Sequence, residues 1–393
     1  MKKKICIITG SRAEYGLFYP LLKLLRNNRL FKLQLVVTGS HLSREFGLTY
    51  REIEQDGFTL SGKVDLKLDS DTPQGVLNSM GLALSGLGKV LTRLKPDAVV
   101  ILGDRFEIFC AATAAYVNRI PVVHLYGGEL SAGAIDEAFR HSITKMSFLH
   151  FTATEEYRRR VIQLGEEPKR IFMVGAIGLD NIKKMKLLTR TQLEESLDFS
   201  LGDQAVLVTF HPVTLETDSA GAQCAELLRA LDQFPDLKII FTRPNADTNG
   251  RVIIKLIEEY VRNNPGRAKS FSSLGQLRYL SSLKQVKAVV GNSSSGIIEA
   301  PSLKIPTVNI GDRQKGRIKA QSIIDCRPEE KDIVTALKKA FSPAFQARCR
   351  KTVNPYGQGY AADKIMRVLA ALNWDKLDLK KSFYDLRGRS VQR

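Results

Sequence analysis

The chain has 393 residues, of which 44% are hydrophobic, and this length predicts two domains of ordinary size. Its apolar runs are no longer than a strand, and Arg12 and Glu14 interrupt the apolar stretch behind the basic N-terminus. We therefore expect neither a membrane span nor a secretory signal, and a cytoplasmic protein. The net charge is +18, and the lysines and arginines are spread along the chain rather than gathered in a nucleic-acid-binding motif. We therefore expect the partner to be a small anionic substrate, and neither nucleic acid nor a membrane.

Runs of β-branched residues alternate with helical segments along the chain, in two series. Many of these runs are apolar throughout, as in parallel strands that are covered on both faces. The alternation predicts an α/β fold of two Rossmann-like, doubly wound domains, with a boundary near Gly178 that gives domains 1–178 and 179–363. The predicted strands are 4–8, 33–38, 98–102, 121–125, 148–152 and 171–174, then 205–210, 237–242, 287–290 and 306–310.

Polar loops follow several of these strands directly. In a doubly wound sheet, ligands bind beyond the carboxyl ends of the strands. Two such domains would face these loops into one cleft. The loops are residues 9–16, 103–107, 126–136, 210–212 and 291–299.

The first loop, TGSRAEYG at 9–16, lacks both the G-x-G-x-x-G fingerprint and the Walker lysine, so it is not predicted to bind a dinucleotide. Arg12 places a cation at a strand end, where it could meet a ligand or form a surface ion pair. The second loop carries Asp104 and Arg105 at a strand tip. Asp104 could take part in chemistry or could cap the following helix.

Two further carboxylates lie in the third loop. Glu129 follows a Gly-Gly turn that lets the backbone approach a ligand, and Asp136 is near a helix start. Together with Asp104, they bring three carboxylates to strand ends of the first domain. Converging carboxylates acquire pKa values split by mutual repulsion, which suits acid/base chemistry. They could also be metal ligands, but no histidine pair or CxxC pair has ligand spacing, so we expect no metal.

The second domain offers three candidates, each with a ligand-binding and a structural interpretation. His211 is at a strand tip, where it could donate to a phosphate, act as a general acid or be structural. Asn245 could hold a ribose hydroxyl or form a turn. Phe271 could pack on a base or in the core.

The run from Gly291 to Arg317, GNSSSGIIEAPSLKIPTVNIGDRQKGR, is the most informative segment. A strand ends, a small polar turn follows, and a helix-like stretch opens, which puts backbone N–H groups and the Ser293 and Ser294 hydroxyls where an anion binds. Glu299, one turn on, fits the two hydroxyls of a sugar, and Arg313, Lys315 and Arg317 add cations downstream. The segment predicts a diphosphate joined to a ribose, although the serines could also only cap the helix.

An ordered set of motifs runs along the chain: TGSRAEYGL (9–17), GDRFE (103–107), H-x-x-GGE (124–129), IDEAFRHSITKMS (135–147), HP (211–212), GNSSSG with Glu299, and GDRQKGR (311–317). The set resembles the hydrolysing UDP-N-acetylglucosamine 2-epimerases of bacterial sialic acid and legionaminic acid synthesis. The resemblance implies the glycosyltransferase-B fold, in which two Rossmann-like domains face each other across a cleft and the second holds most of the nucleotide. It also implies a homodimer and a last helix at about 364–373 that crosses back, so that 364–393 packs on the first domain.

The resemblance assigns roles to the motif residues. Asp104 and Asp136 carry over as catalytic carboxylates, and His211 would stabilise the departing diphosphate. Some relatives have an acid/base glutamate where this chain has Tyr126, and others a histidine, so either Glu129 or Tyr126 would act on C2. The implied substrate contacts are Ser293, Ser294 and Gly296 at the diphosphate, Glu299 at the ribose, and Arg12, Arg105, Asn245, Phe271 and Arg313 around them.

Chemistry restricts the mechanism of such an enzyme. The C2–H bond of an N-acetylhexosamine adjoins no carbonyl, so we expect UDP to leave first and C2–H to become acidic as C1 gains oxocarbenium character. Anti elimination would give a 2-acetamidoglycal, and hydration would give a free manno-configured sugar for nonulosonic acid synthesis, with neither metal nor NAD. Residues 41–58 and NIKKMKLLTR (181–190) resemble the legionaminic acid branch of the family more closely, which implies UDP-N,N'-diacetylbacillosamine rather than UDP-N-acetylglucosamine. The alternatives are a non-hydrolysing 2-epimerase and a glycosyltransferase of the same fold.

Overall fold

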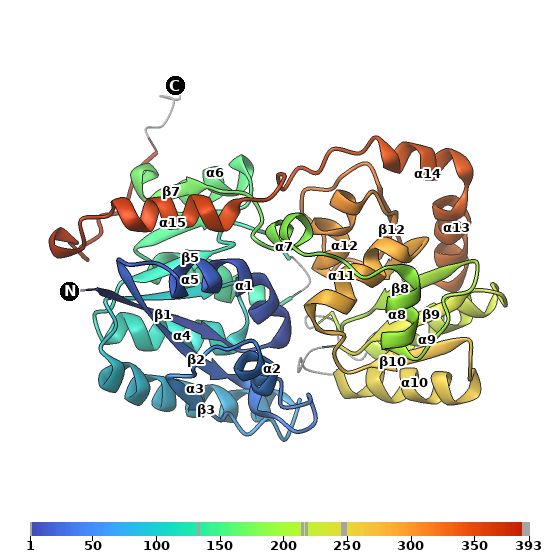
Figure 1. Ribbon diagram of the computed structural model, residues 1–393, viewed down its shortest axis with the longest axis horizontal. Coiled ribbons are helices and arrows are strands. Elements are labelled where there is room, and N and C mark those ends of the chain that lie inside the picture. The colour runs from blue at the N-terminus through green and yellow to red at the C-terminus, as the bar shows by residue number, and fades with distance from the viewer. Residues whose placement is uncertain (1, 132–133, 214–215, 217–218, 245–249, 387–393) are drawn as a thin grey trace, which may run out of the picture.

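The structure is a computed structural model that describes residues 2–131, 134–213, 216, 219–244 and 250–386. It contains two parallel sheets that lie side by side, each with helices on both faces (Figure 1). This arrangement confirms the predicted α/β fold of two doubly wound domains.

The two sheets share one topology. The strand order is β3-β2-β1-β4-β5-β6-β7 in the first sheet and β10-β9-β8-β11-β12-β13 in the second, and every hydrogen-bonded pair is parallel. The order reverses between β1 and β4 and again between β8 and β11, and these switch points open a crevice for a ligand. The strands are β1 Lys3–Thr9, β2 Phe31–Thr38, β3 Gly62–Val64, β4 Ala98–Leu102, β5 Val122–Leu125, β6 Leu149–Thr152, β7 Ile171–Met173, β8 Ala205–Thr209, β9 Lys238–Thr242, β10 Ala268–Phe271, β11 Ala288–Gly291, β12 Thr307–Ile310 and β13 Ile323–Cys326.

Each predicted strand is present, with ends that differ by two residues at most. Two short strands, β3 and β13, lie outside the predicted set, and these two and β10 have a partner on one side at most. Each is only partly buried, because a strand on the outer side of a sheet exposes part of its length. Such strands lack the continuous apolar run that marks the central ones.

The helices fill the connections between strands, as right-handed parallel crossovers require. The α-helices are α1 Arg12–Arg26, α2 Tyr50–Gln55, α3 Pro73–Leu94, α4 Phe106–Val117, α5 Asp136–Met146, α6 Glu155–Gln163, α7 Gly178–Lys184, α8 Arg190–Leu197, α9 Ser219–Asp232, α10 Gly250–Asn263, α11 Gly275–Gln285, α12 Ser294–Ile298, α13 Glu330–Phe341, α14 Pro343–Arg350 and α15 Ala361–Ala371. Short 3-10 turns cover Gly39–Leu42, Pro168–Arg170, Ala300–Leu303 and Trp374–Lys376.

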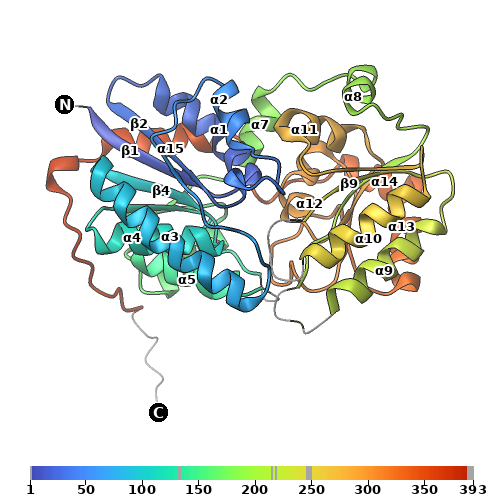
Figure 2. The ribbon, with the colours of Figure 1, turned by 90° about the horizontal axis from the view of Figure 1, so that it is seen from below.

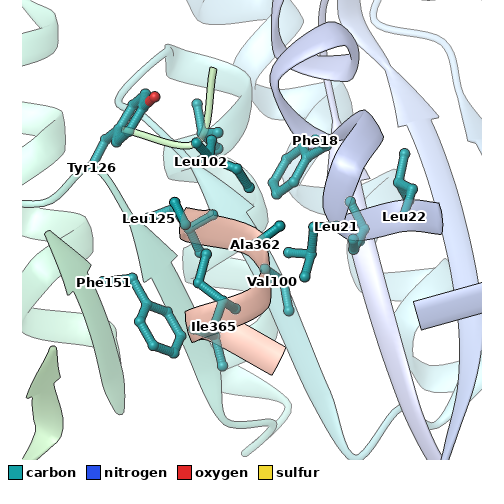
Figure 3. Close-up of a cluster of buried hydrophobic side chains, with 14 of the residues drawn as sticks. Phe18, Leu21, Leu22, Val100, Leu102, Leu125, Tyr126, Phe151, Ala362 and Ile365 are labelled. Carbon is teal, nitrogen blue, oxygen red and sulfur yellow. The ribbon is translucent and has the colours of Figure 1, made fainter. Parts of the chain in front are cut away.

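The last helix, α15, returns to the first domain (Figure 1). Its buried residues Ala362 and Ile365 join the core formed by Phe18 and Leu21 of α1 and by Val100 of β4 (Figure 3). The helix starts three residues earlier than predicted, at Ala361. Among the described residues, no helix is both long and apolar enough to cross a bilayer.

Candidate active site

Two adjoining cavities lie at the carboxyl ends of the strands, between the domains. We call the first, of about 150 Å³, the carboxylate chamber; Asp104, Tyr126, Glu129, Asp136, Arg140 and Arg317 are among its lining residues. We call the second, of about 250 Å³, the serine chamber; Arg12, Thr209, His211, Arg243, Tyr279, Ser293 and Ser295 are among its lining residues. Ser294, Glu299 and Arg313 line both, so the chambers form one cleft. Figure 2 shows α1, α7 and α12 meeting where the two domains adjoin.

Arg140 organises the carboxylate chamber. Its side chain is 1% exposed and forms ion pairs with Asp104 and with Glu137, the latter at 2.5 Å. It also donates to the Ser131 hydroxyl and, at 2.8 Å, to the main-chain oxygen of Glu129. A buried guanidinium thus satisfies its donors on groups from β4, β5 and α5, and this fixes the chamber wall.

Asp104 and Glu129 share this chamber, but their pKa values shift in opposite directions. Burial alone would raise the pKa of Asp104, but the charge and hydrogen bond of Arg140 hold it below its ordinary value. Burial raises the pKa of Glu129, although Arg317, at 3.0 Å, and Arg140 oppose that rise. Two carboxyls with split proton affinities in one cavity have the properties of an acid/base site.

Three other predicted residues of the first domain, Arg105, Tyr126 and Asp136, also line this chamber. Asp136 begins α5, and Arg105 donates to Glu107 Oε1 at 2.7 Å. Tyr126 has a left-handed backbone (φ 71°), and its hydroxyl accepts from the Gly178 N–H at 3.4 Å. Burial, with the nearby charges of two glutamates, raises the pKa of Tyr126 well above 10, so it remains a phenol at neutral pH.

A second pair of buried carboxylates, Glu14 and Glu107, lies at this chamber, which Glu14 helps to line. Glu14 accepts the Gly10 N–H at 2.7 Å, and burial together with the charge of Glu107 raises the pKa of Glu14 to about 8. One oxygen of each carboxylate has no hydrogen-bond partner. Sequence reasoning did not single out Glu14 or Arg140 for a role, and it named Arg317 only as a cation downstream of the serine turn, because positions in the motifs do not reveal which neighbours these residues meet.

In the serine chamber, Asn292 fixes both His211 and the neighbouring loop. The Asn292 side chain accepts from the His211 N–H at 2.7 Å and donates to the His211 carbonyl at 2.8 Å. The Asn292 carbonyl accepts from Arg313 at 3.2 Å and from Gln314 at 2.8 Å. The imidazole and the arginine are therefore held beside the same turn.

Three serines and Glu299 come directly after that turn in the chain. Ser293 is the N-cap of α12 and accepts from the Ser295 N–H at 3.4 Å, so the predicted cap is present, while Ser294 and Ser295 line the chamber. Burial raises the pKa of Glu299 to about 7. Arg12 lines the chamber and forms an ion pair with Glu52; the ion-pair interpretation is therefore confirmed, and the contact with a ligand stays a prediction.

Three predicted ligand residues differ from the rest. Asn245 lies outside the described residues. Phe271 ends β10 and packs on the hydrophobic cluster beside α8 and α11; it is not among the lining residues of either chamber. Gly296 lies against the sheet, where an added Cβ would come within 2.7 Å of Thr307 Cγ2, so its lack of a side chain allows α12 to pack closely; its contact with the diphosphate stays a prediction. Within the described part of the chain, no group of three or more His, Cys, Asp or Glu residues has the arrangement of a metal site.

Comparisons with known proteins assign the chain to one family, and the matches cover nearly its whole length. A family model described as UDP-N-acetylglucosamine 2-epimerase matches residues 23–370. The chain is 44% identical to a GDP/UDP-N,N'-diacetylbacillosamine 2-epimerase (hydrolyzing) of Campylobacter jejuni, over 98% of this chain and 100% of the relative. It is 40% identical to the polysialic acid biosynthesis protein P7 of Escherichia coli, over 98% of each chain. It is 37% identical to a UDP-N,N'-diacetylbacillosamine 2-epimerase (hydrolyzing) of Legionella pneumophila, over 95% of this chain and 97% of the relative.

Solved structures share the fold. The UDP-GlcNAc 2-epimerase of Neisseria meningitidis, bound to UDP-GlcNAc, superimposes with a TM-score of 0.79 at 19% identity, over 93% of this chain and 99% of that chain. At this identity the likeness concerns the fold: two Rossmann-like domains that face each other across a cleft, the glycosyltransferase-B type.

Proposed function

Because the chain belongs to the UDP-N-acetylglucosamine 2-epimerase family, we propose that it is a hydrolysing 2-epimerase that releases UDP and a free, C2-inverted sugar from a UDP-N-acetylhexosamine. One observation carries this proposal. The chamber that holds Asp104 and Glu129, with their oppositely shifted pKa values, shares Ser294, Glu299 and Arg313 with the serine chamber. Acid/base groups are thus joined to a place for a nucleotide diphosphate.

The proposed substrate is UDP-N,N'-diacetylbacillosamine, and the product is 2,4-diacetamido-2,4,6-trideoxymannose. Two relatives at 44% and 37% identity bear the name of an enzyme for this sugar, which supports the choice. UDP-N-acetylglucosamine, which would give N-acetylmannosamine, is the second candidate, because a relative at 40% identity is named for polysialic acid biosynthesis. Either product would serve nonulosonic acid synthesis in the cytoplasm.

In the first step, the C1–O bond to UDP breaks while C2 loses its proton. The diphosphate would lie against Ser293, Ser294 and the N–H groups at the start of α12, with His211 and Arg313 beside it. The carboxylate of Asp104, kept ionised by Arg140, would stabilise the positive charge that develops at C1.

Glu129 is the proposed base for the C2 proton. Its Oε1 has no hydrogen-bond partner, it lines the chamber, and its raised pKa suits proton exchange better than the lowered pKa of Asp104. Tyr126 is a poor base because its hydroxyl is protonated at neutral pH. The elimination gives a 2-acetamidoglycal and UDP.

In the second step, water adds to C1 and C2 receives a proton on the opposite face. Inversion requires a proton donor on that face, and we assign it to Asp136 at the start of α5. The overall balance is one UDP-sugar and one water consumed, and one UDP and one free sugar formed. None of these steps draws on a redox cofactor.

We also propose a homodimer through α3 and α4. These helices cover one face of the first sheet (Figure 1), and the start of α3 lies beside α10 of the second domain. Tyr116 and Val117 at the end of α4 are 58% and 74% exposed, and Leu77 of α3 is 59% exposed. A Cβ at Gly81 or Gly88 of α3 would meet no atom, so a partner helix could approach closely. Light scattering on Val117→Lys tests this face: a monomer is expected, and an unchanged dimer would contradict it.

Product analysis tests the proposed activity. The chain would be incubated separately with UDP-N,N'-diacetylbacillosamine, the corresponding GDP-sugar and UDP-N-acetylglucosamine, and the products followed by NMR. We expect free UDP and a free manno sugar from the first. An inverted sugar still joined to UDP would indicate a non-hydrolysing epimerase, and transfer to an added acceptor would indicate a glycosyltransferase.

A further inference from the structure

Arg317 reaches from the second domain into the carboxylate chamber. It lies beyond β12, and its side chain, 9% exposed, forms an ion pair with Glu129 Oε2 at 3.0 Å. Its Nε donates to the Leu130 carbonyl, also at 3.0 Å. Gly316 beside it has φ 85°, and a Cβ there would come within 2.8 Å of Leu130 Cδ1. The two domains therefore touch where the candidate base is located.

Two tyrosines hold the next residue from both sides. The Ile318 N–H donates to the Tyr157 hydroxyl at 3.2 Å, and the Tyr356 hydroxyl donates to the Ile318 carbonyl at 3.0 Å. The two hydroxyls are 2.9 Å apart and both residues are fully buried. Because Tyr157 comes from α6 of the first domain, the backbone beside Arg317 has a fixed position only when the domains are together.

Several charged and titratable groups influence Glu129. Arg317 and Arg140 favour its ionised form, while Asp104 and Glu137 disfavour it. Arg140 contacts the main-chain oxygen of Glu129, whereas Arg317 contacts its carboxylate. Arg317 is therefore the cation that pairs with the acidic group itself. The groups that interact with Glu129 are Arg140 and Glu137 of α5, Asp104 after β4, Tyr126 after β5, Tyr157 of α6, Glu299 after α12, Arg317 after β12, and Tyr356 before α15.

We propose that Arg317 is a positioning residue for the epimerase reaction, which pairs with Glu129 across the closed domains and keeps this carboxylate ionised and aligned as the base. The proposal rests on the proposed function, because it concerns the proton taken from C2. An open cleft would separate the pair, so the base would become competent only when the sugar is enclosed. The same loop carries Arg313, which lines the serine chamber, and so joins the diphosphate site to the base.

The pH profile of turnover reveals this role. Removing a cation beside a carboxylate raises its pKa by about 1–3 units. A base must be ionised to act, so the acid limb of kcat should move to higher pH by that amount in Arg317→Gln. At pH values below the limb, activity should fall about tenfold for each unit of the shift and recover as the pH is raised, because each pKa unit corresponds to about tenfold in the ionised fraction.

Three variants separate this role from a general effect on closure. Arg317→Gln removes the charge, and Arg317→Lys keeps it. Arg251→Gln is the matched control, since Arg251 joins the domains through Glu45 at 2.9 Å but lines neither chamber. UDP binding by calorimetry checks that each variant is folded. We expect the limb to move in Arg317→Gln, to stay near the wild-type position in Arg317→Lys, and to stay unchanged in Arg251→Gln.

Two results would overturn the proposal. One is a loss in Arg317→Gln of the same size at every pH, with the limb unmoved. The other is the same limb shift in Arg251→Gln, which would assign the effect to closure alone. Neither result would contradict the proposed function. The proposed function is tested separately, by measuring turnover of the UDP-sugar by the unaltered chain.

Discussion

The two chambers of the cleft lie at equivalent switch points of two similar sheets, yet they are built from different side chains. The carboxylate chamber is lined by ionised groups in pairs, such as Arg140 with Asp104 and Arg317 with Glu129. The serine chamber is lined largely by hydroxyls and main-chain groups, with Asn292 holding the histidine and the arginine. The first arrangement sets the proton affinities of Asp104 and Glu129, and the second offers donors for an anion, with Glu299 as a titratable group that both chambers share.

This difference predicts that substitutions in the two chambers affect different steps of catalysis. Changes in the carboxylate chamber should affect the chemical step, because they alter which groups are ionised in a site shielded from water. Changes in the serine chamber should affect substrate binding more, because single hydrogen bonds contribute about 0.5–1.5 kcal/mol each.

The largest effect is expected at the base. Glu129→Gln keeps the shape of the side chain but removes its proton affinity, so kcat should fall about 10²–10⁴-fold. Tyr126→Phe should lower kcat less than about tenfold, because a single hydroxyl hydrogen bond is lost and no base is removed. Steady-state kinetics at saturating UDP-sugar provide the measurement. The opposite ranking would assign the action on C2 to Tyr126.

A pH effect of intermediate size is expected in the serine chamber. The pKa of Glu299 is raised to about 7 by burial, so this carboxyl is protonated below that pH and ionised above it. Only the ionised form accepts from both ribose hydroxyls, so KM should rise as the pH falls through about 7, by roughly tenfold per unit below it. Glu299→Gln should raise KM at high pH and remove this dependence. A KM that falls on acidification would contradict the assignment.

The smallest effect distinguishes capping from diphosphate binding. Ser293 caps α12 beside the cleft, and Ser342 caps α14 away from the cleft. Each Ser→Ala change should cost about 0.5–2 kcal/mol of stability, measured by urea denaturation. Only Ser293→Ala should also raise KM, by about 2–10-fold for one hydrogen bond. Equal KM values in the two variants would leave Ser293 as a cap alone.

Much of the fold was predictable from sequence. The central strands are apolar throughout because both faces are covered, and that pattern is visible in the chain. Strands β3 and β13 escaped the prediction because they are short and partly exposed. The loops of the cleft were predictable as a set, since carboxyl ends of parallel strands meet at one edge.

The partners of the site residues were not predictable. Arg140 meets Asp104 only because α5 returns beside the end of β4, and Arg317 meets Glu129 only because the domains close. The spacing of these residues along the sequence does not reveal that either pair is in contact. The packing role of Gly296 was not predictable either, because the sequence does not show that Thr307 lies against this glycine.

The central claim is that UDP leaves as the neighbouring carbon gives up its proton, within one cleft. The most direct test is turnover in deuterated, ¹⁸O-enriched water, with substrate and products analysed by NMR and mass spectrometry. We predict one deuterium at C2 and ¹⁸O at C1 of the released sugar, with neither label in UDP or in the remaining UDP-sugar. Deuterium in the UDP-sugar pool, or ¹⁸O in UDP, would contradict it.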